Sequence, residues 1–141
     1  MLYIEKPEIF NPKFEVVGCF MEYKNEFLLL LRQDHKNEPN TYGIPGGKVW
    51  AWEKIDVAIR REIKEETWIE EVNLEYFKEV YVRYPTYDFI YHMYSTKLKY
   101  EPEIKINPEE HKSYIWRKPI DALKENLIED LDVCIKMFYK I

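Results

Sequence analysis

The sequence predicts a single mixed domain in which a β-sheet lies between helices. Two β-rich runs at residues 14–22 and 27–32 flank a short polar turn, and two long aromatic runs follow at 72–84 and 87–99. Apolar residues recur at helical spacing in one central segment and one C-terminal segment. Strands on both sides of a central helix, with another helix at the end, indicate an α+β fold or an α/β/α sandwich.

The remaining segments fill in the order of elements. Residues 1–12 contain two prolines and are expected to form an arm or a short edge strand. Residues 33–41 are polar and predict a surface loop, and residues 100–110 predict a second loop with a short strand at 104–106. A brief strand is predicted at 113–117. The helical signals near the C-terminus are a helix start at Pro119 and an amphipathic set of Leu127, Leu131, Cys134, Ile135 and Phe138.

Length and composition limit the classes of protein. The 141 residues are expected to form one domain, 1–141, with a single substantial core. Hydrophobic residues make up 46% and charged residues 33%, which argues against disorder. The formal net charge of −5 gives no general attraction to nucleic acid or to anionic membranes. We expect no signal peptide, no membrane span and free buried thiols at Cys19 and Cys134, so the predicted location is the cytoplasm.

A cluster of carboxylates follows a pair of adjacent glycines. Glu62, Glu65 and Glu66 lie at positions i, i+3 and i+4 of a helix predicted for residues 54–67, so they project from one face. Grouped carboxylates repel one another and usually need a hard cation to neutralise them. A divalent-metal site is therefore predicted, and a solvated acidic face is the alternative. The apolar stripe that can face the core is Ile55, Ala58, Ile59 and Ile63.

The spacing of these charged residues resembles the signature of the MutT-like Nudix hydrolases. That signature is a glycine, five spacers, a glutamate, seven spacers and then R-E-U-x-E-E-x-G-U, where U is aliphatic. Trp68 stands where the signature has its second glycine. The matching positions are Gly47, Glu53, Arg61, Glu62, Ile63, Glu65, Glu66 and Ile69.

The resemblance implies an α/β fold, a Nudix-type α/β/α sandwich with a mixed sheet and a loop-helix-loop catalytic motif. It also implies hydrolysis of a nucleoside diphosphate linked to another group, by attack of water at phosphorus. The implied cofactor is Mg²⁺, with Mn²⁺ as the other candidate, because hard oxygen ligands suit these ions better than zinc. Such an ion neutralises the phosphates and lowers the pKa of bound water.

The resemblance assigns roles to individual residues. Arg61 and Glu53 would form an ion pair that orients the helix carboxylates. Lys48, beside the glycine pair, and Arg32, at the end of an apolar strand, could hold phosphate oxygens or could be merely solvated. The implied metal ligands are Glu62, Glu65, Glu66 and the backbone carbonyl of Gly46.

The motif does not fix the general base. A motif glutamate is one candidate, and the loop at residues 107–112 supplies Glu109, Glu110 and His111 as others. We favour Glu110 as an additional metal ligand or base. The alternative is that this glutamate is simply exposed to solvent, as loop glutamates usually are.

Three tryptophans are particular to this chain. Trp50 and Trp52 follow the glycine pair, and each could stack on a nucleobase or, alternatively, fill the core or a dimer interface. Trp68 replaces a glycine that commonly adopts positive φ, so either the helix runs longer or the indole packs against the terminal helix or a strand. The other aromatic residues that extend the stacking hypothesis are Tyr42, Tyr84, Tyr87 and Phe89.

Three functions stay open from the sequence. The first is Mg²⁺-dependent hydrolysis of a nucleoside triphosphate with release of pyrophosphate. The second is hydrolysis of a nucleotide sugar similar to GDP-mannose, for which some relatives use a histidine in a loop comparable to that of His111. The third is a noncatalytic Nudix domain, which the retained carboxylates disfavour. The expected partner is a nucleotide-derived small molecule, with no membrane and no specific nucleic acid, and the aromatic strands could supply a homodimer interface.

Overall fold

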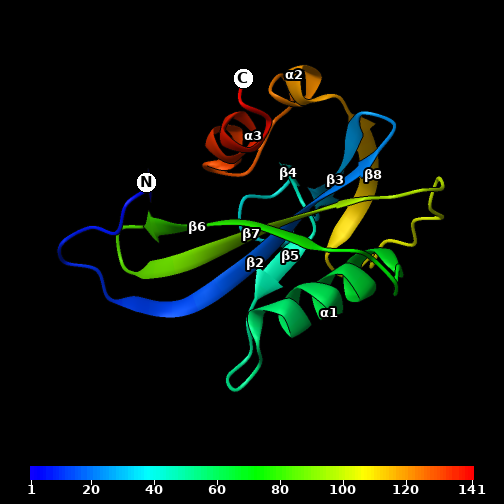
Figure 1. Cartoon of the computed structure of the whole chain (residues 1–141). Coiled ribbons are helices and arrows are strands. Elements are labelled where there is room, and N and C mark those ends of the chain that lie inside the picture. Colours follow the sequence, from blue (N-terminus) through cyan, green and yellow to red (C-terminus); the bar gives the residue numbers. More distant parts are fainter.

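The computed structural model describes residues 1–141 as one mixed β-sheet between helices (Figure 1). The strands are β1 (Leu2–Tyr3), β2 (Pro12–Tyr23), β3 (Glu26–Arg32), β4 (Tyr42–Gly43), β5 (Gly46–Lys48), β6 (Glu75–Arg83), β7 (Asp88–Lys97) and β8 (His111–Arg117). The helices are α1 (Ile55–Thr67), α2 (Pro119–Ala122) and α3 (Leu131–Tyr139). None of these helices is long and apolar enough to cross a membrane.

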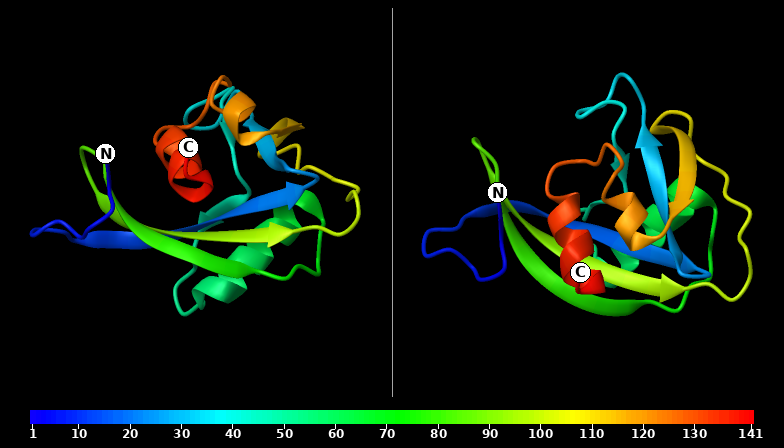
Figure 2. Two further views of the ribbon diagram at one scale, coloured as in Figure 1. Left: turned by 45° about the horizontal axis from the view of Figure 1, so that its top comes forward. Right: turned by 90° about the horizontal axis from the view of Figure 1, so that it is seen from above.

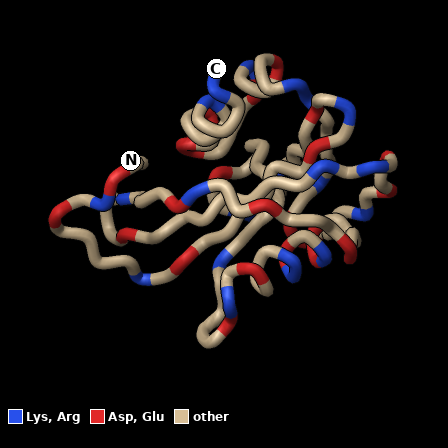
Figure 3. The backbone as a smooth tube through the Cα atoms, viewed as in Figure 1, with Lys and Arg blue, Asp and Glu red and all other residues tan.

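The sheet follows the order β1-β6-β7-β2-β3-β4, with β5 paired to β2 and β8 paired to β3. The long strands β2 and β7 run parallel, whereas the other pairs are antiparallel, so the sheet is mixed as predicted. Helix α1 covers one face and α2 and α3 cover the other (Figure 2). The predicted α/β/α sandwich is confirmed. Lys and Arg are interspersed with Asp and Glu along the chain (Figure 3).

Alternation along the strands divides the core into two halves. Val17 of β2 packs toward α1, and its near neighbour Phe20 packs toward α3, because successive side chains of a strand point to opposite faces. On the α3 side, the rings of Phe20 and Phe138 stack with their centroids 4.6 Å apart. Cys19 and Cys134 are free and buried, as expected. In the predicted apolar stripe of α1, Ala58, Ile59 and Ile63 are fully buried and Ile55 is partly buried.

Several element boundaries differ from the expectation. Strands β4 and β5 were not predicted, because both are short and contain glycine, which is depleted in strands. A Cβ atom at Gly46 would collide with the Val17 carbonyl oxygen, so β5 can approach β2 only because glycine stands there. Residues 104–106 form no strand, although Ile104 is buried. Helix α3 begins at Leu131 rather than near Leu127, because Leu127 pairs with Tyr42 in an isolated β-bridge.

Trp68 ends helix α1 in an unusual way. It adopts the left-handed conformation with φ 68°, and its N–H donates to the Lys64 carbonyl at 2.9 Å. The indole is 62% exposed. Both expectations for this residue are wrong: the helix does not run longer, and the ring is not buried by packing. The tryptophan instead keeps the backbone geometry that a glycine commonly provides at a helix C-terminus.

Trp68→Gly is expected to raise the free energy of unfolding by about 1 kcal/mol, because glycine has no Cβ penalty in the left-handed region. Urea unfolding measures this change. Trp68→Ala is the matched control, since it removes the indole but keeps the Cβ atom and should bring no such gain. A Trp68→Gly protein that is less stable than Trp68→Ala would contradict the strain argument.

Candidate active site

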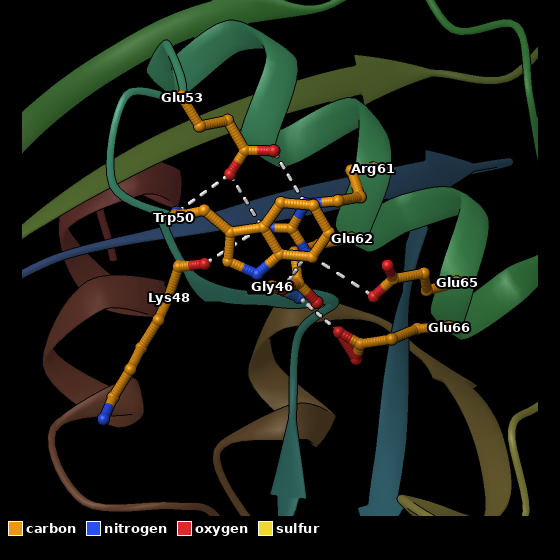
Figure 4. Close-up of polar contacts among 8 residues, drawn as sticks. All are labelled: Gly46, Lys48, Trp50, Glu53, Arg61, Glu62, Glu65 and Glu66. Atoms are coloured by element: carbon orange, nitrogen blue, oxygen red, sulfur yellow. Dashed lines mark hydrogen bonds and ion pairs between the residues drawn. The ribbon is translucent and has the colours of Figure 1, made fainter.

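Arg61 lies at the centre of a polar cluster between α1 and the loop that precedes it (Figure 4). Its guanidinium binds both carboxylate oxygens of Glu53, with Nε 2.7 Å from Oε2 and Nη2 2.8 Å from Oε1. Nη2 also donates to the Lys48 carbonyl at 3.0 Å, and Nη1 donates to Glu62 Oε1 at 2.8 Å. The hydrogen bond from Arg61 lowers the pKa of Glu53. The structure therefore brings together the predicted pair of Arg61 and Glu53.

Trp50 covers this ion pair. Its ring centroid lies 3.7 Å from the Arg61 guanidinium carbon, and its backbone N–H donates to Glu53 Oε1 at 2.9 Å. The indole is 59% exposed, so the alternative that Trp50 fills the core is wrong. One ring face is occupied by Arg61, and stacking of a nucleobase on Trp50 stays a prediction. Trp52 nearby is fully exposed, with φ 71°.

Glu62 and Glu66 are the sheltered carboxylates of α1. The side chains of Glu62 and Glu66 are 13% and 7% exposed, and the Gly46 N–H donates to Glu66 Oε1 at 2.9 Å. A Cβ atom at Gly47 would lie 2.5 Å from a carboxylate oxygen of Glu62, so the glycine makes room for it. Burial raises the pKa of Glu62, and it raises the pKa of Glu66 well above its usual value. Two adjoining buried carboxylates form an arrangement that a cation would stabilise.

Glu65 is oriented differently. Its side chain is 49% exposed and lies 3.4 Å from Arg61 Nη1. No group of three or more His, Cys, Asp or Glu side chains is gathered as a metal site in this conformation. The donors along this edge of α1 are nevertheless all carboxylate oxygens, which fit Mg²⁺ or Mn²⁺ rather than zinc. The carbonyl of Gly46 and the three glutamates stay predicted ligands.

Strand β8 brings His111 to the motif. His111 Nδ1 is buried without a hydrogen-bond partner and lies 3.9 Å from Glu66 Oε2. Burial lowers the pKa of His111 to about 4. Glu110 reaches the same region and pairs with Lys36 at 3.2 Å. Glu109 is exposed, so of the three candidate bases outside the motif, Glu110 and His111 are the two that the structure places at the site.

A cavity of about 200 Å³ extends from the motif along the sheet face beneath α3. Arg32 lines it, and Arg32 Nε donates to the Asn37 carbonyl at 2.7 Å. Asp130 also lines it, and its Oδ2 is buried without a hydrogen-bond partner. Sequence reasoning missed Asp130 because it is remote from the motif. The aromatic residues that line the cavity are Tyr84, Phe89 and Tyr91; strand alternation in β7 was the one signal that could have placed Tyr91 there.

The structure does not bring the Lys48 side chain to the carboxylates. Its ammonium lies 4.3 Å from the ring centroid of Phe14 and points away from the glutamates (Figure 4). The backbone carbonyl of Lys48 is the group that contacts Arg61. Lys48 therefore supports the site through its main chain in this conformation.

A NUDIX domain model matches residues 12–138. The MutT protein from Methanosarcina mazei Go1 superposes with a TM-score of 0.80 at 22% identity, covering 94% of this chain and 97% of that chain. A C. elegans Ap4A hydrolase in a binary complex gives 0.75 at 21% identity, with 90% and 96% covered. The NUDIX domain of Shewanella oneidensis NrtR, complexed with ADP ribose, gives 0.76 at 19% identity, with 96% and 92% covered. At such low identity, these superpositions show that the fold is shared and no more. No curated protein sequence matches the chain.

Proposed function

The chain belongs to the Nudix hydrolase family, and from this premise we propose that it is a Mg²⁺-dependent pyrophosphohydrolase. Its substrate is a nucleoside triphosphate or another compound linked through a nucleoside diphosphate, cleaved by attack of water at phosphorus. The observation that carries the proposal is the set of contacts that Arg61 makes with Glu53 and Glu62, beside the buried Glu66.

The chain's own residues prepare the site for the reaction. Arg61 holds one oxygen of Glu62, and the Gly46 N–H holds one oxygen of Glu66, so both carboxylates are oriented before any ligand binds. Glu62, Glu65 and Glu66 would hold Mg²⁺, which supplies charge neutralisation and a bound water of lowered pKa.

The adjoining cavity would receive the substrate. Its apolar and aromatic walls exclude water from the group that enters, and Arg32 would bind phosphate oxygens at the end nearest the motif. Glu110 lines the same cavity, and we propose it as the base or as an additional metal ligand.

A second candidate is hydrolysis of a nucleotide sugar. It is favoured by the position of His111, whose ring lies beside Glu66 rather than on an exposed loop. A noncatalytic nucleotide-binding domain is the third candidate, and the retained motif carboxylates argue against it. The cytoplasmic location and a homodimer stay predictions.

We expect Mg²⁺-dependent release of phosphate or pyrophosphate from at least one compound in a panel of nucleoside triphosphates, nucleotide sugars and dinucleoside polyphosphates. Removal of divalent ions with EDTA should abolish the release, and restored Mg²⁺ should recover it. Colorimetric phosphate detection, with and without inorganic pyrophosphatase, distinguishes the two products. Ligand binding by calorimetry without hydrolysis of any compound would favour the noncatalytic alternative.

A further inference from the structure

A second, open hollow lies beside the motif helix. Glu66 lines the cavity beneath α3, whereas its neighbour Glu65 lines this other hollow. Lys64 of α1 and Trp68, the residue directly after the helix, form one wall, and the segment around Pro108 forms the opposite wall. The two sequential glutamates therefore border two different spaces.

Trp68 borders the same hollow as two motif residues, Arg61 and Glu65. Arg61 and Glu65 lie at positions i and i+4 along one stripe of α1, and Trp68 follows the end of the helix. Trp50 stacks on Arg61 at one end of this stripe, and the Trp68 indole stands at the other end, beyond Glu65. A group bound against Trp68 would thus be adjacent to a motif carboxylate.

The fold gains little from Trp68. Its ring is 62% exposed, and its backbone occupies the left-handed region at φ 68°. A bulky residue in this region costs about 1 kcal/mol or more. Strained non-glycine residues of this kind are concentrated at ligand-binding sites. The exposed indole therefore calls for an explanation other than core packing.

One lysine ammonium group lies near the exposed ring of Trp68. Lys105 Nζ lies 5.9 Å from its ring centroid, and the Lys105 N–H donates to the Thr67 carbonyl at 3.1 Å, which ties this segment to the end of α1. Lys64 carries a 57% exposed side chain and pairs with Glu70 at 3.2 Å. An exposed indole beside the Lys105 ammonium group matches a planar ring that carries phosphate.

We propose that this hollow is a subsite for a second nucleotide unit of the substrate, whose base stacks on Trp68 and whose phosphate lies near Lys64 and Lys105. The inference rests on the proposed function, because the phosphate chain would pass Glu65 and Glu66 between the two spaces. Hydrolysis then forms a bond from a water oxygen to phosphorus and breaks one phosphoanhydride bond. The leaving phosphate keeps the electron pair, and the water proton goes to solvent or to the base. The favoured substrate class is two nucleosides joined through a phosphate chain.

The test compares kcat/KM for diadenosine tetraphosphate with kcat/KM for ATP. Trp68→Gly is expected to lower the ratio of the two values by about tenfold, since one base stack is lost. Trp68→Phe should retain most of the ratio. Tyr100→Gly is the control, because Tyr100 is also an exposed aromatic residue but lies outside the hollow, and it should leave the ratio unchanged. An unchanged ratio in Trp68→Gly overturns the subsite.

A binding measurement separates this inference from the proposed function. A nonhydrolysable methylene analogue of diadenosine tetraphosphate is titrated by calorimetry in Mg²⁺, where no hydrolysis occurs. Trp68→Gly should raise the Kd by about tenfold, and Tyr100→Gly should leave it unchanged. If no compound of the panel is hydrolysed, the proposed function fails and the Kd values alone decide the subsite. Absence of binding by the wild-type protein, or equal Kd values for wild type and Trp68→Gly, overturns it.

Discussion

Glu66→Gln is expected to abolish Mg²⁺-dependent hydrolysis while leaving the fold intact. A metal ion supplies several kcal/mol of transition-state stabilisation, so kcat should fall on the order of 10³-fold or more. The glutamine carbonyl can still accept the hydrogen bond from the Gly46 N–H. Burial raises the pKa of Glu66, which means that its ionised form is disfavoured in the folded protein without a cation. A neutral amide at this position therefore resembles the uncharged carboxyl group and should not destabilise the metal-free fold.

Two measurements check this expectation. Steady-state kinetics on a confirmed substrate gives the loss of kcat, and thermal unfolding with and without Mg²⁺ shows whether the metal still stabilises the variant. Glu65→Gln is expected to lose hydrolysis as well. Glu70→Gln is the control, because Glu70 is 64% exposed and lies outside the motif. Normal turnover by both motif variants would overturn the assignment.

The sequence predicted the parts of the site that depend on local spacing. Glu53 and Arg61 are eight residues apart, and one helix with its preceding loop is enough to bring them together. The approach of His111 to Glu66 is different, because it depends on the register of β8 against β3, in which His111 pairs with Arg32. The loop could be nominated from its composition, but no local pattern specifies that register.

The tryptophans show a second limit of sequence reasoning. The left-handed geometry at Trp68 could be anticipated from the signature glycine, yet the side chain suggested a longer helix or a packed ring. The backbone geometry persists and the strain is tolerated. The contact of Trp50 with Arg61 was missed because it depends on the loop path between β5 and α1 rather than on a periodic pattern.

Arg61→Lys is expected to lower kcat/KM by about 10–100-fold, the usual cost of losing a residue that orients metal ligands. A lysine ammonium cannot hold both oxygens of Glu53 and at the same time reach Glu62 and the Lys48 carbonyl, whereas the planar guanidinium does so. Mg²⁺ affinity should fall with it. Arg60→Lys is the matched control on the same helix, since Arg60 is exposed and donates only to the Val72 carbonyl. Unaltered kcat/KM in Arg61→Lys would contradict the orienting role.

A double-mutant cycle then decides what Trp50 does. The indole could act by covering Arg61, which it contacts at 3.7 Å, or by stacking its free face on a nucleobase. If it acts through Arg61, Trp50→Ala lowers kcat/KM in the wild-type background and adds no further loss in Arg61→Lys, because the two residues form one unit. If it stacks on the base, Trp50→Ala raises KM equally in both backgrounds. Since the guanidinium already occupies one face of the indole, we expect the first result, in which the tryptophan acts by holding the arginine that orients the carboxylates.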